Sequence, residues 1–279
     1  MLVNSNEMLK VAKAGKYAIP SPDFIDLTSL KAYIEVAEEF NMPVIISFAE
    51  AFFKESNLNL AEIANIGIFA AKNAKVDVCL HLDHGMNEET VYQAIDLGFS
   101  SVMIDASKKS FDENVAITKR VVEYAHKRNV SVEAEIGHVG SNDTVEASEE
   151  ESIYTEVAEA AKFYELTKVD SLAVSIGTSH GLYKGTPKIN FERLQELAAN
   201  VKCPLVLHGG SSSGDDNLNR CSTNGITKIN IFTDLIVAGL KEIQDNNPKD
   251  LFELNRLKTK GMKEMLAHYY NVFECVRKG

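Results

Sequence analysis

Eight short apolar segments recur along the chain, and each has the length and composition of a buried β-strand. They are rich in Val, Ile and Leu on both faces, which is typical of parallel strands covered by helices. They begin at intervals of about 22 to 40 residues, which leaves room for a helix between successive strands. The segments span residues 17–20, 43–48, 76–82, 101–104, 130–136, 171–176, 204–207 and 226–231.

The stretches between these segments carry helical periodicity. Apolar residues recur there at spacings of three and four, as at Ile117, Val121 and Tyr124. The clearest helical stretches are 27–40, 87–97, 112–128, 155–167 and 191–199, and a further one covers 252–275. Eight strands that alternate with helices predict an α/β fold, a TIM (β/α)8 barrel with extra C-terminal helices. The alternative is an open doubly wound sheet, but no GxGxxG follows the first strand.

Length and charge limit the classes of function. The 279 residues contain no linker, repeat or low-complexity stretch, so we expect one domain over 1–279. The net charge of −11 argues against a nucleic-acid partner or an anionic membrane surface. The N-terminus does not resemble a signal peptide, and no apolar run reaches the roughly 18 residues of a membrane span. We therefore expect a cytoplasmic protein that binds a small molecule.

Polar residues follow the predicted strands at the positions where a barrel carries its chemistry. In a TIM barrel the carboxyl ends of the strands meet at one face. Histidines and acids from distant parts of the chain would therefore meet at a single site. The residues at these strand ends are Asp83, His84, Asp105, Glu135, His180, His208, Asn230 and Thr233.

Three of these residues are histidines, which favour a metal site. Neutral imidazoles suit zinc, cobalt or iron, and three of them leave coordination positions open for water or substrate. We select His84, His180 and His208 as the ligands. Each could instead be a hydrogen-bonded core histidine. His81 lies three residues before His84 and could compete for the ligand role, but we place it outside the ligand set.

The acids at the strand ends suggest further roles. Asp83 adjoins a predicted ligand, which is the position of a general acid/base that must reach the proton it moves. It could instead orient an imidazole. Asp105 and Glu135 could hold a second divalent or monovalent cation, or could be salt-bridge partners at the barrel mouth.

Glycines near the last strands predict a phosphate site. They permit close backbone approach, and phosphate sites from the last strands are common in this fold. Lys184 would add a positive charge. The candidate phosphate-binding residues are Gly181, Gly209, Gly210, Ser211, Asn230 and Thr233.

Seven motifs in the chain resemble those of the class II, metal-dependent ketose-bisphosphate aldolases, the family of fructose- and tagatose-bisphosphate aldolase. The resemblance covers most of the chain, in one order. The motifs span residues 17–20, 81–85, 101–107, 132–137, 176–181, 205–211 and 228–230.

The resemblance implies a TIM barrel with zinc at His84, His180 and His208, and Asp83 as the proton donor. It also implies that dihydroxyacetone phosphate is held by Gly181, Lys184, Gly209, Gly210, Ser211, Asn230, Phe232 and Thr233. The implied reaction is reversible cleavage of fructose or tagatose 1,6-bisphosphate to dihydroxyacetone phosphate and glyceraldehyde 3-phosphate. Such enzymes are usually homodimers or homotetramers.

The chain departs from the family pattern at four places, which include the segment 211–214 and the C-terminal tail, and the other two bear on the site residues. Asp23 stands near the position of a family asparagine, and a carboxylate cannot donate a hydrogen bond to a phosphate. We take Asp23 and Ser47 as candidate specificity residues. The loop at 140–144 lacks the family's paired glycines followed by acids, so Asp143 or Glu146 could supply the loop proton.

These departures keep two alternatives open. One is an aldolase of the same half-reaction with a different aldehyde partner, which Asp23 favours. The other is a paralogue that binds metal and sugar phosphate with little turnover. Asp83 argues against the second alternative, because a pure binder needs no poised acid.

Overall fold

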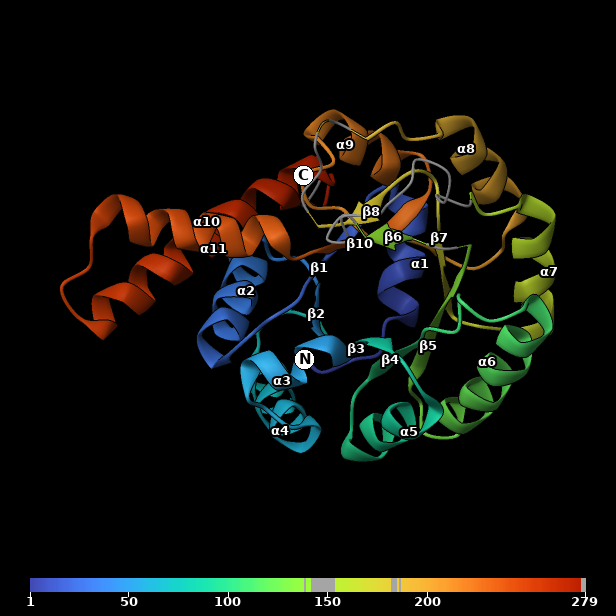
Figure 1. Cartoon of the computed structure of the whole chain (residues 1–279), viewed down its shortest axis with the longest axis horizontal. Helices are drawn as coiled ribbons and strands as arrows, with labels where there is room; N and C mark the ends of the chain where they lie inside the picture. Colours follow the sequence, from blue (N-terminus) through green and yellow to red (C-terminus); the bar gives the residue numbers. More distant parts are fainter. Residues whose placement is uncertain (138, 142–153, 182–184, 186, 277–279) are drawn as a thin grey trace.

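The chain folds into a closed barrel of eight parallel strands surrounded by helices (Figure 1). This computed structural model describes residues 1–137, 139–141, 154–181, 185 and 187–276. The order of strands around the barrel is β1-β10-β9-β7-β5-β4-β3-β2. The strands are β1 (Ile19–Pro22), β2 (Val44–Ala49), β3 (Val78–Gly85), β4 (Ser101–Ile104), β5 (Ser131–Ile136), β7 (Ser171–Val174), β9 (Leu205–Leu207) and β10 (Ile226–Ile231).

The barrel closes between β1 and β2. Asp23 and Ser47 form a parallel bridge there, and the Phe24 amide donates to the Ser47 carbonyl over 3.0 Å. This closure confirms the predicted TIM barrel and shows that the alternative of an open sheet was wrong. A two-stranded sheet of β6 (Gly140–Ser141) and β8 (Ser179–His180) lies outside the barrel ladder.

Helices form a ring around the strands, and α10 and α11 extend from it as an arm (Figure 1). Side-chain caps define several helix starts, as at Asp26, Asn59 and Ser110, where complete capping boxes form. Among the described residues, no helix could cross a membrane. The helices are α1 (Asn6–Gly15), α2 (Leu27–Phe40), α3 (Phe53–Ser56), α4 (Leu60–Asn73), α5 (Glu88–Leu97), α6 (Phe111–His126), α7 (Val157–Thr167), α8 (Phe191–Asn200), α9 (Asp215–Thr223), α10 (Thr233–Asn246) and α11 (Leu251–Val272), with a 3-10 turn η1 (Glu50–Phe52).

The N-terminal segment crosses the amino ends of the strands. Leu2 forms a parallel bridge with Val78 at the start of β3, and the Ser5 hydroxyl donates to the Ser131 hydroxyl at the start of β5 over 2.8 Å. The Lys13 ammonium of α1 donates to the carbonyls of residues 201, 202 and 203 just before β9. The N-terminal segment therefore covers this end of the barrel and is held there by backbone and side-chain hydrogen bonds.

The register of the strands orders the polar side chains along the barrel axis. Lys228 of β10 lies opposite Ile19 of β1, and Asn230 lies opposite Ser21. Because inward-facing positions alternate along a strand, Asn230 lies one layer closer to the carboxyl end than Lys228. The next inward position on β1 is Asp23. The interior thus becomes a polar site toward the carboxyl end, as the sequence predicted.

Candidate active site

A cavity of about 440 Å³ opens at the carboxyl ends of the strands. It collects almost every site residue that the sequence singled out. The predicted residues that line it are Asp23, Asp83, His84, Asp105, Glu135, His180, Gly181, Gly209, Gly210, Ser211, Asn230, Phe232 and Thr233. Lys184, Asp143 and Glu146 lie outside the described residues.

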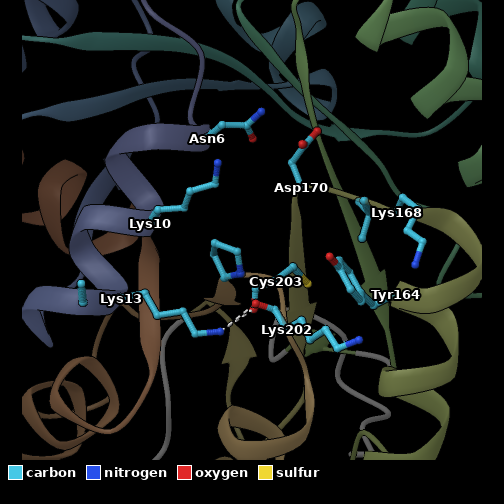
Figure 2. Close-up of a pocket in the computed structure, with 11 residues that line it drawn as sticks. Asn6, Lys10, Lys13, Tyr164, Lys168, Asp170, Lys202 and Cys203 are labelled. Carbon is cyan, nitrogen blue, oxygen red and sulfur yellow. Dashed lines mark hydrogen bonds between the residues drawn. The ribbon is translucent and has the colours of Figure 1, made fainter.

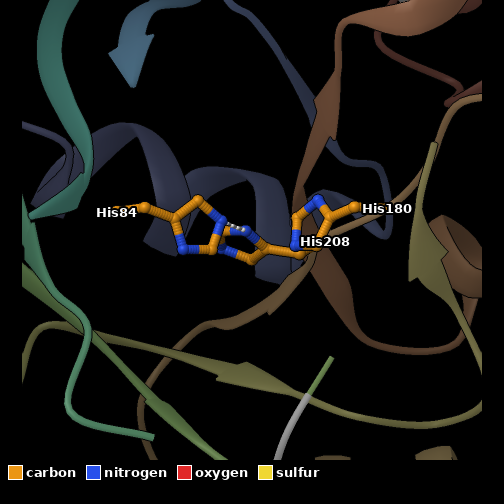
Figure 3. Close-up of side chains that lie close together, drawn as sticks. All are labelled: His84, His180 and His208. Carbon is orange, nitrogen blue, oxygen red and sulfur yellow. Dashed lines mark hydrogen bonds between the residues drawn. The ribbon is translucent and has the colours of Figure 1, made fainter. Parts of the chain in front are cut away.

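The three predicted metal ligands lie together, with their imidazole rings edge to face (Figure 3). His84 and His180 line the cavity, whereas His208 is fully buried beside them. The ring centroids of His84 and His180 are 5.0 Å apart, and those of His180 and His208 are 5.8 Å apart. The Nε2 atom of His84 lies 2.9 Å from the Nδ1 atom of His208. One ring nitrogen from each of the three histidines falls within 4.8 Å of the others.

A bulge in β3 turns His84 toward its partners. The register between β3 and β4 shifts between Leu82 and Gly85, so Asp83 and His84 occupy the irregular part of the strand. His84 has a φ of 46°, in the left-handed region that non-glycine residues rarely adopt. Bulges commonly re-aim side chains beside functional sites. Here Asp83 lies inside β3, which extends beyond the predicted end at residue 82.

Two carboxylates orient two of the imidazoles. The Asp105 carboxylate lies 2.9 Å from Nδ1 of His84, and the Glu133 carboxylate lies 2.8 Å from Nε2 of His208. The other nitrogens of these two rings, Nε2 of His84 and Nδ1 of His208, meet at the shared centre. Metal-binding histidines commonly hydrogen-bond a carboxylate in this way, which fixes the tautomer and raises basicity. The donor set therefore fits a divalent metal such as zinc.

A buried lysine supports this arrangement from below. The Lys228 ammonium donates to both oxygens of Glu133 over 3.0 and 2.9 Å and lies 3.3 Å from Nε2 of His81. Nδ1 of His81 lies 2.8 Å from the Ser101 hydroxyl. Burial and the Lys228 charge lower the pKa of His81 well below its ordinary value. His81 thus lies beneath the three-histidine cluster, grouped with Asp83 and Glu133, and its exclusion from the ligand set stays a prediction.

Asp83 is held where it can act on a bound molecule. Its side chain is 3% exposed, and one oxygen accepts a hydrogen bond of 2.9 Å from the Asn230 amide. The other oxygen lies 3.8 Å from Nε2 of His84. Burial alone would raise the pKa of Asp83, but the positive charges of His84 and Lys228 lower it. This position, beside His84 and fixed by the Asn230 amide, suits a group that moves a proton.

Asp105 and Glu135 form a second acidic group with His84, within 4.8 Å of one another. Burial and the nearby Asp105 charge raise the pKa of Glu135 to about 8. Its Oε1 atom accepts from the Val139 amide over 3.2 Å, while its buried Oε2 atom has no partner in the described part of the chain. This arrangement could hold a cation, although Asp105 already supports His84, and the second cation site stays a prediction.

The predicted phosphate turn is shaped by close backbone approach. Gly209 has a φ of 66°, and a Cβ atom there would come within 2.4 Å of the Ser179 carbonyl. At Gly210 a Cβ atom would come within 2.7 Å of the Asn230 carbonyl. The Ser211 hydroxyl accepts from the amides of Phe232 and Asp234. It thereby joins this turn to the start of α10, which begins at Thr233 without a side-chain cap. The positive end of such a helix is favourable for a phosphate.

The two candidate specificity residues have different surroundings. Asp23 is 4% exposed and lines the cavity, and its buried Oδ1 atom has no hydrogen-bond partner among the described residues. Burial and the Asp83 charge raise its pKa well above the ordinary value. The Ser47 hydroxyl instead shares a 2.6 Å hydrogen bond with the Ser21 hydroxyl and does not line the cavity.

Our sequence reasoning missed an aromatic wall and the buried ion pair. Phe52 of η1 stacks on Phe232 with ring centroids 4.5 Å apart. An aromatic run after the second strand was a visible signal for this wall. A lysine in an otherwise apolar strand was the signal for Lys228. The other lining residues that the sequence did not single out are Ala49, Ala51, Met86, Lys108, Val139 and Ile231.

A second cavity, of about 430 Å³, lies at the amino ends of β7 and β9 (Figure 2). Lys10 and Lys13 reach it from α1, and Lys168 and Lys202 line it from the opposite side. Each ammonium group already has partners, because Lys10 pairs with Glu7, Lys13 binds backbone carbonyls, and Lys168 and Lys202 share Glu165. None of the described residues that line this cavity has a buried polar side-chain atom without a partner, unlike the first cavity.

Fold and site together define a TIM-barrel enzyme whose chemistry lies at the carboxyl ends of the strands. The family model for class II fructose-bisphosphate aldolase matches residues 3–278. The chain therefore belongs to the class II fructose-bisphosphate aldolase family, whose members are aldehyde-lyases.

Individual relatives agree with this assignment. The fructose-bisphosphate aldolase of Staphylococcus epidermidis is 39% identical over 256 residues, which cover 90% of this chain and 89% of that protein. The crystal structure of the YdjI aldolase from Escherichia coli K12 superposes with a TM-score of 0.88 at 34% identity, covering 98% of this chain and 97% of that one. A fructose-bisphosphate aldolase from Campylobacter jejuni, at 24% identity and a TM-score of 0.83, shares the fold over 100% of this chain and 97% of that one.

Proposed function

We propose that this protein is a metal-dependent aldolase that reversibly cleaves a ketose phosphate between C3 and C4 to dihydroxyacetone phosphate and an aldehyde. The reference substrates are fructose and tagatose 1,6-bisphosphate, which give glyceraldehyde 3-phosphate. One observation supports this most strongly. Three imidazoles lie within reach of one ion, two of them at the cavity wall, beside Asp83 and a glycine turn at a helix N-terminus.

The proposed metal site consists of His84, His180 and His208. The family is typically zinc-dependent, and the donor set described above fits zinc. A zinc ion at this site would supply Lewis acidity toward the ketone of the substrate. Asp105 and Glu135 could hold a second divalent or monovalent cation.

Asp83 would move the proton of the reacting hydroxyl. In the cleavage direction its carboxylate accepts the proton of the C4 hydroxyl, and the C4 oxygen becomes the aldehyde carbonyl. The C3–C4 bond breaks, and its electron pair passes to the enediolate of the departing dihydroxyacetone phosphate. A second acid then protonates C3. Asp143 and Glu146 remain candidates for that acid.

The phosphate of the dihydroxyacetone half would be held by Gly181, the turn at 209–211 and the start of α10. The backbone amide of Thr233, the neighbouring Phe232, the Asn230 side chain and the Lys184 charge complete the proposed set. Gly209 and Gly210 support this role, since both lie too close to neighbouring carbonyls to carry a side chain. We also propose a homodimer or homotetramer.

A cleavage assay over a panel of ketose mono- and bisphosphates tests the proposal. We expect dihydroxyacetone phosphate to be released by the zinc-loaded protein, activity to disappear on chelation, and zinc to restore it. Activity that survives complete metal removal would contradict the three-histidine site.

Two other functions are distinguished by the same assay. A different aldehyde partner is supported by Asp23, and would appear as cleavage of a ketose phosphate other than the two bisphosphates. A paralogue without turnover would bind dihydroxyacetone phosphate and cleave none of the panel. The poised carboxylate of Asp83 speaks against this paralogue.

A further inference from the structure

Asp23 presents a buried oxygen atom to the cavity that no other described residue uses. Its side chain is 4% exposed, yet Oδ1 has no hydrogen-bond partner in the described part of the chain. Buried polar atoms in native structures are nearly always satisfied, so an exception at a cavity wall points to a ligand. The Oδ1 atom of Asn230 is a second such acceptor, since the Asn230 amide nitrogen already donates to Asp83.

The two acceptors lie on neighbouring strands, at successive levels of the barrel. Asn230 lies opposite Ser21 in the β1–β10 ladder, and Asp23 is the next inward position toward the mouth. The amide of Asp23 donates to the carbonyl of Ile231 over 3.4 Å. A molecule that reaches from Asp83 toward the mouth along β1 therefore meets two oxygen acceptors in turn.

The rest of this sector of the wall is uncharged. Ala49 and Ile231 come from the ends of β2 and β10, and Ala51 and Phe52 of η1 and Phe232, just after β10, add a small side chain and two stacked rings. Among the described lining residues of the sector, Asp23 is the one ionisable side chain. Lys108 lines the cavity from beyond β4, outside this sector. Among the described residues of the sector, a phosphate dianion would find no cation to offset its lost hydration, which is costly. A hydroxyl group can instead donate to Asp23 or to Asn230.

On the basis of the proposed aldolase function, we propose that Asp23 selects the aldehyde half of the substrate by accepting a hydrogen bond from one of its hydroxyl groups. The substrate class is then a ketose 1-phosphate whose aldehyde-side carbons carry hydroxyl groups and no second phosphate. The phosphate turn and the zinc site would bind the dihydroxyacetone phosphate half of the substrate, and Asp23 would bind the aldehyde half.

The test compares fructose 1-phosphate with fructose 1,6-bisphosphate, using the full-length, zinc-loaded protein. Both substrates release dihydroxyacetone phosphate, so a single coupled assay measures kcat/KM for each. We expect the wild type to prefer the 1-phosphate. Asp23→Asn offers an amide donor in the same shape and should shift the ratio of the two kcat/KM values toward the bisphosphate by about tenfold or more. Asp23→Ala should lose efficiency on the 1-phosphate without gaining on the bisphosphate. Asp112→Asn, an exposed carboxylate on α6, is the matched control and should leave the ratio unchanged.

A second readout separates this inference from the proposed function. Exchange of a hydroxymethyl proton of dihydroxyacetone phosphate with solvent deuterium reports enediolate formation without any aldehyde. This exchange should be the same in the wild type and in Asp23→Asn. If the wild type exchanges the proton but prefers the bisphosphate, or if its substrate ratio is unchanged in Asp23→Asn, the role of Asp23 is overturned and the aldolase function stands. If the wild type with zinc catalyses no exchange, the aldolase function itself fails, and this inference fails with it.

Discussion

The two ends of the barrel differ in whether their charged and polar groups have hydrogen-bond or ion-pair partners. At the amino end, the lysines around the smaller cavity all have carboxylate or carbonyl partners. At the carboxyl end, buried oxygens of Asp23, Glu135 and Asn230 have no partner among the described residues. Satisfied groups contribute to stability, whereas unsatisfied buried groups cost stability and persist where a ligand uses them. We infer that pairing, more than charge content, distinguishes a structural end from a functional one.

The largest expected effect on activity comes from Asp83→Ala at the carboxyl end of the barrel. Loss of the acid/base should lower kcat by about 10²–10⁴-fold. Zinc content should be retained, because Asp83 is outside the proposed ligand set. Steady-state kinetics and metal analysis on the same preparation check both points, with Asp112→Ala as the control. Parallel loss of zinc and activity would instead make Asp83 a structural support of the metal site.

The second prediction concerns Lys228→Met. Lys228 lies beneath the three-histidine cluster and pairs with Glu133, which contacts His208. Removing the ammonium leaves the Glu133 charge buried without its partner, which should cost about 3–5 kcal/mol of unfolding free energy. Zinc affinity should also fall, since Glu133 orients His208. Urea unfolding and zinc titration measure the two effects. Lys119→Met, at an exposed site on α6, is the control. A double variant with Glu133→Gln should recover part of the stability, and no recovery would contradict the ion-pair explanation.

The third prediction tests the amino end directly. Lys13→Met removes hydrogen bonds from an ammonium group to three backbone carbonyls and should cost about 1.5–3 kcal/mol of stability. Zinc content, kcat and KM should stay at wild-type values. Thermal or urea unfolding and the cleavage assay check this separation. A change of KM with unchanged stability would mean that the amino end has a functional role.

The smallest effect is expected at Asp26, three residues after Asp23. Asp26 caps α2 through the Ser29 amide over 2.8 Å and pairs with Lys258 of α11 over 2.5 Å. Asp26→Ala should cost about 1 kcal/mol of stability and leave the substrate ratio unchanged. Comparison of Asp26, which has partners, with Asp23, which has an oxygen without a partner among the described residues, tests whether hydrogen-bond pairing also distinguishes structural from functional residues within the carboxyl end.

The Asp26 contribution should depend on pH. Burial opposes the shift, but hydrogen bonds from Lys258 and Ser29 lower the pKa of Asp26 from 3.8 to about 2. The folded pKa is below the unfolded one, so the contribution is present above about pH 4 and is lost as the pH falls toward 2. Urea unfolding of wild type and Asp26→Ala at pH 7 and pH 3 should show a smaller difference at the lower pH. A difference that grows on acidification would contradict this assignment.

Much of the architecture could be predicted from hydrophobic pattern alone. The number of strands followed from the apolar runs. His84, Glu135 and His208 stand at the ends of such runs, and a barrel brings the ends of its strands together, so a shared site could be predicted. The bulge at Asp83 and His84 could not be foreseen, since it depends on how β3 and β4 pair. The partner of Glu133 was equally hidden, because Lys228 is 95 positions away along the chain.

The substrate pocket was harder to predict than the metal site. Phe52 lies on a short turn after β2, and its contact with Phe232 arises only when the barrel closes. Asp23 and Ser47 were both candidate specificity residues, yet the structure gives Ser47 a hydroxyl partner and leaves an oxygen of Asp23 without a partner among the described residues. Whether a polar side chain is satisfied is a property of three-dimensional neighbours, which a linear pattern does not contain.

The closure of the barrel between β1 and β2 has a consequence for how this enzyme could diversify. The Asp23–Ser47 bridge and the Phe24 amide bond join the two strands at the mouth, so the seam of the sheet and the proposed selector of the aldehyde are the same few residues. The seam is made by backbone atoms, whereas selection would depend on a side chain. A substitution of the Asp23 side chain could therefore change the aldehyde that the enzyme accepts. The strand closure, the metal ligands and the phosphate turn would stay the same.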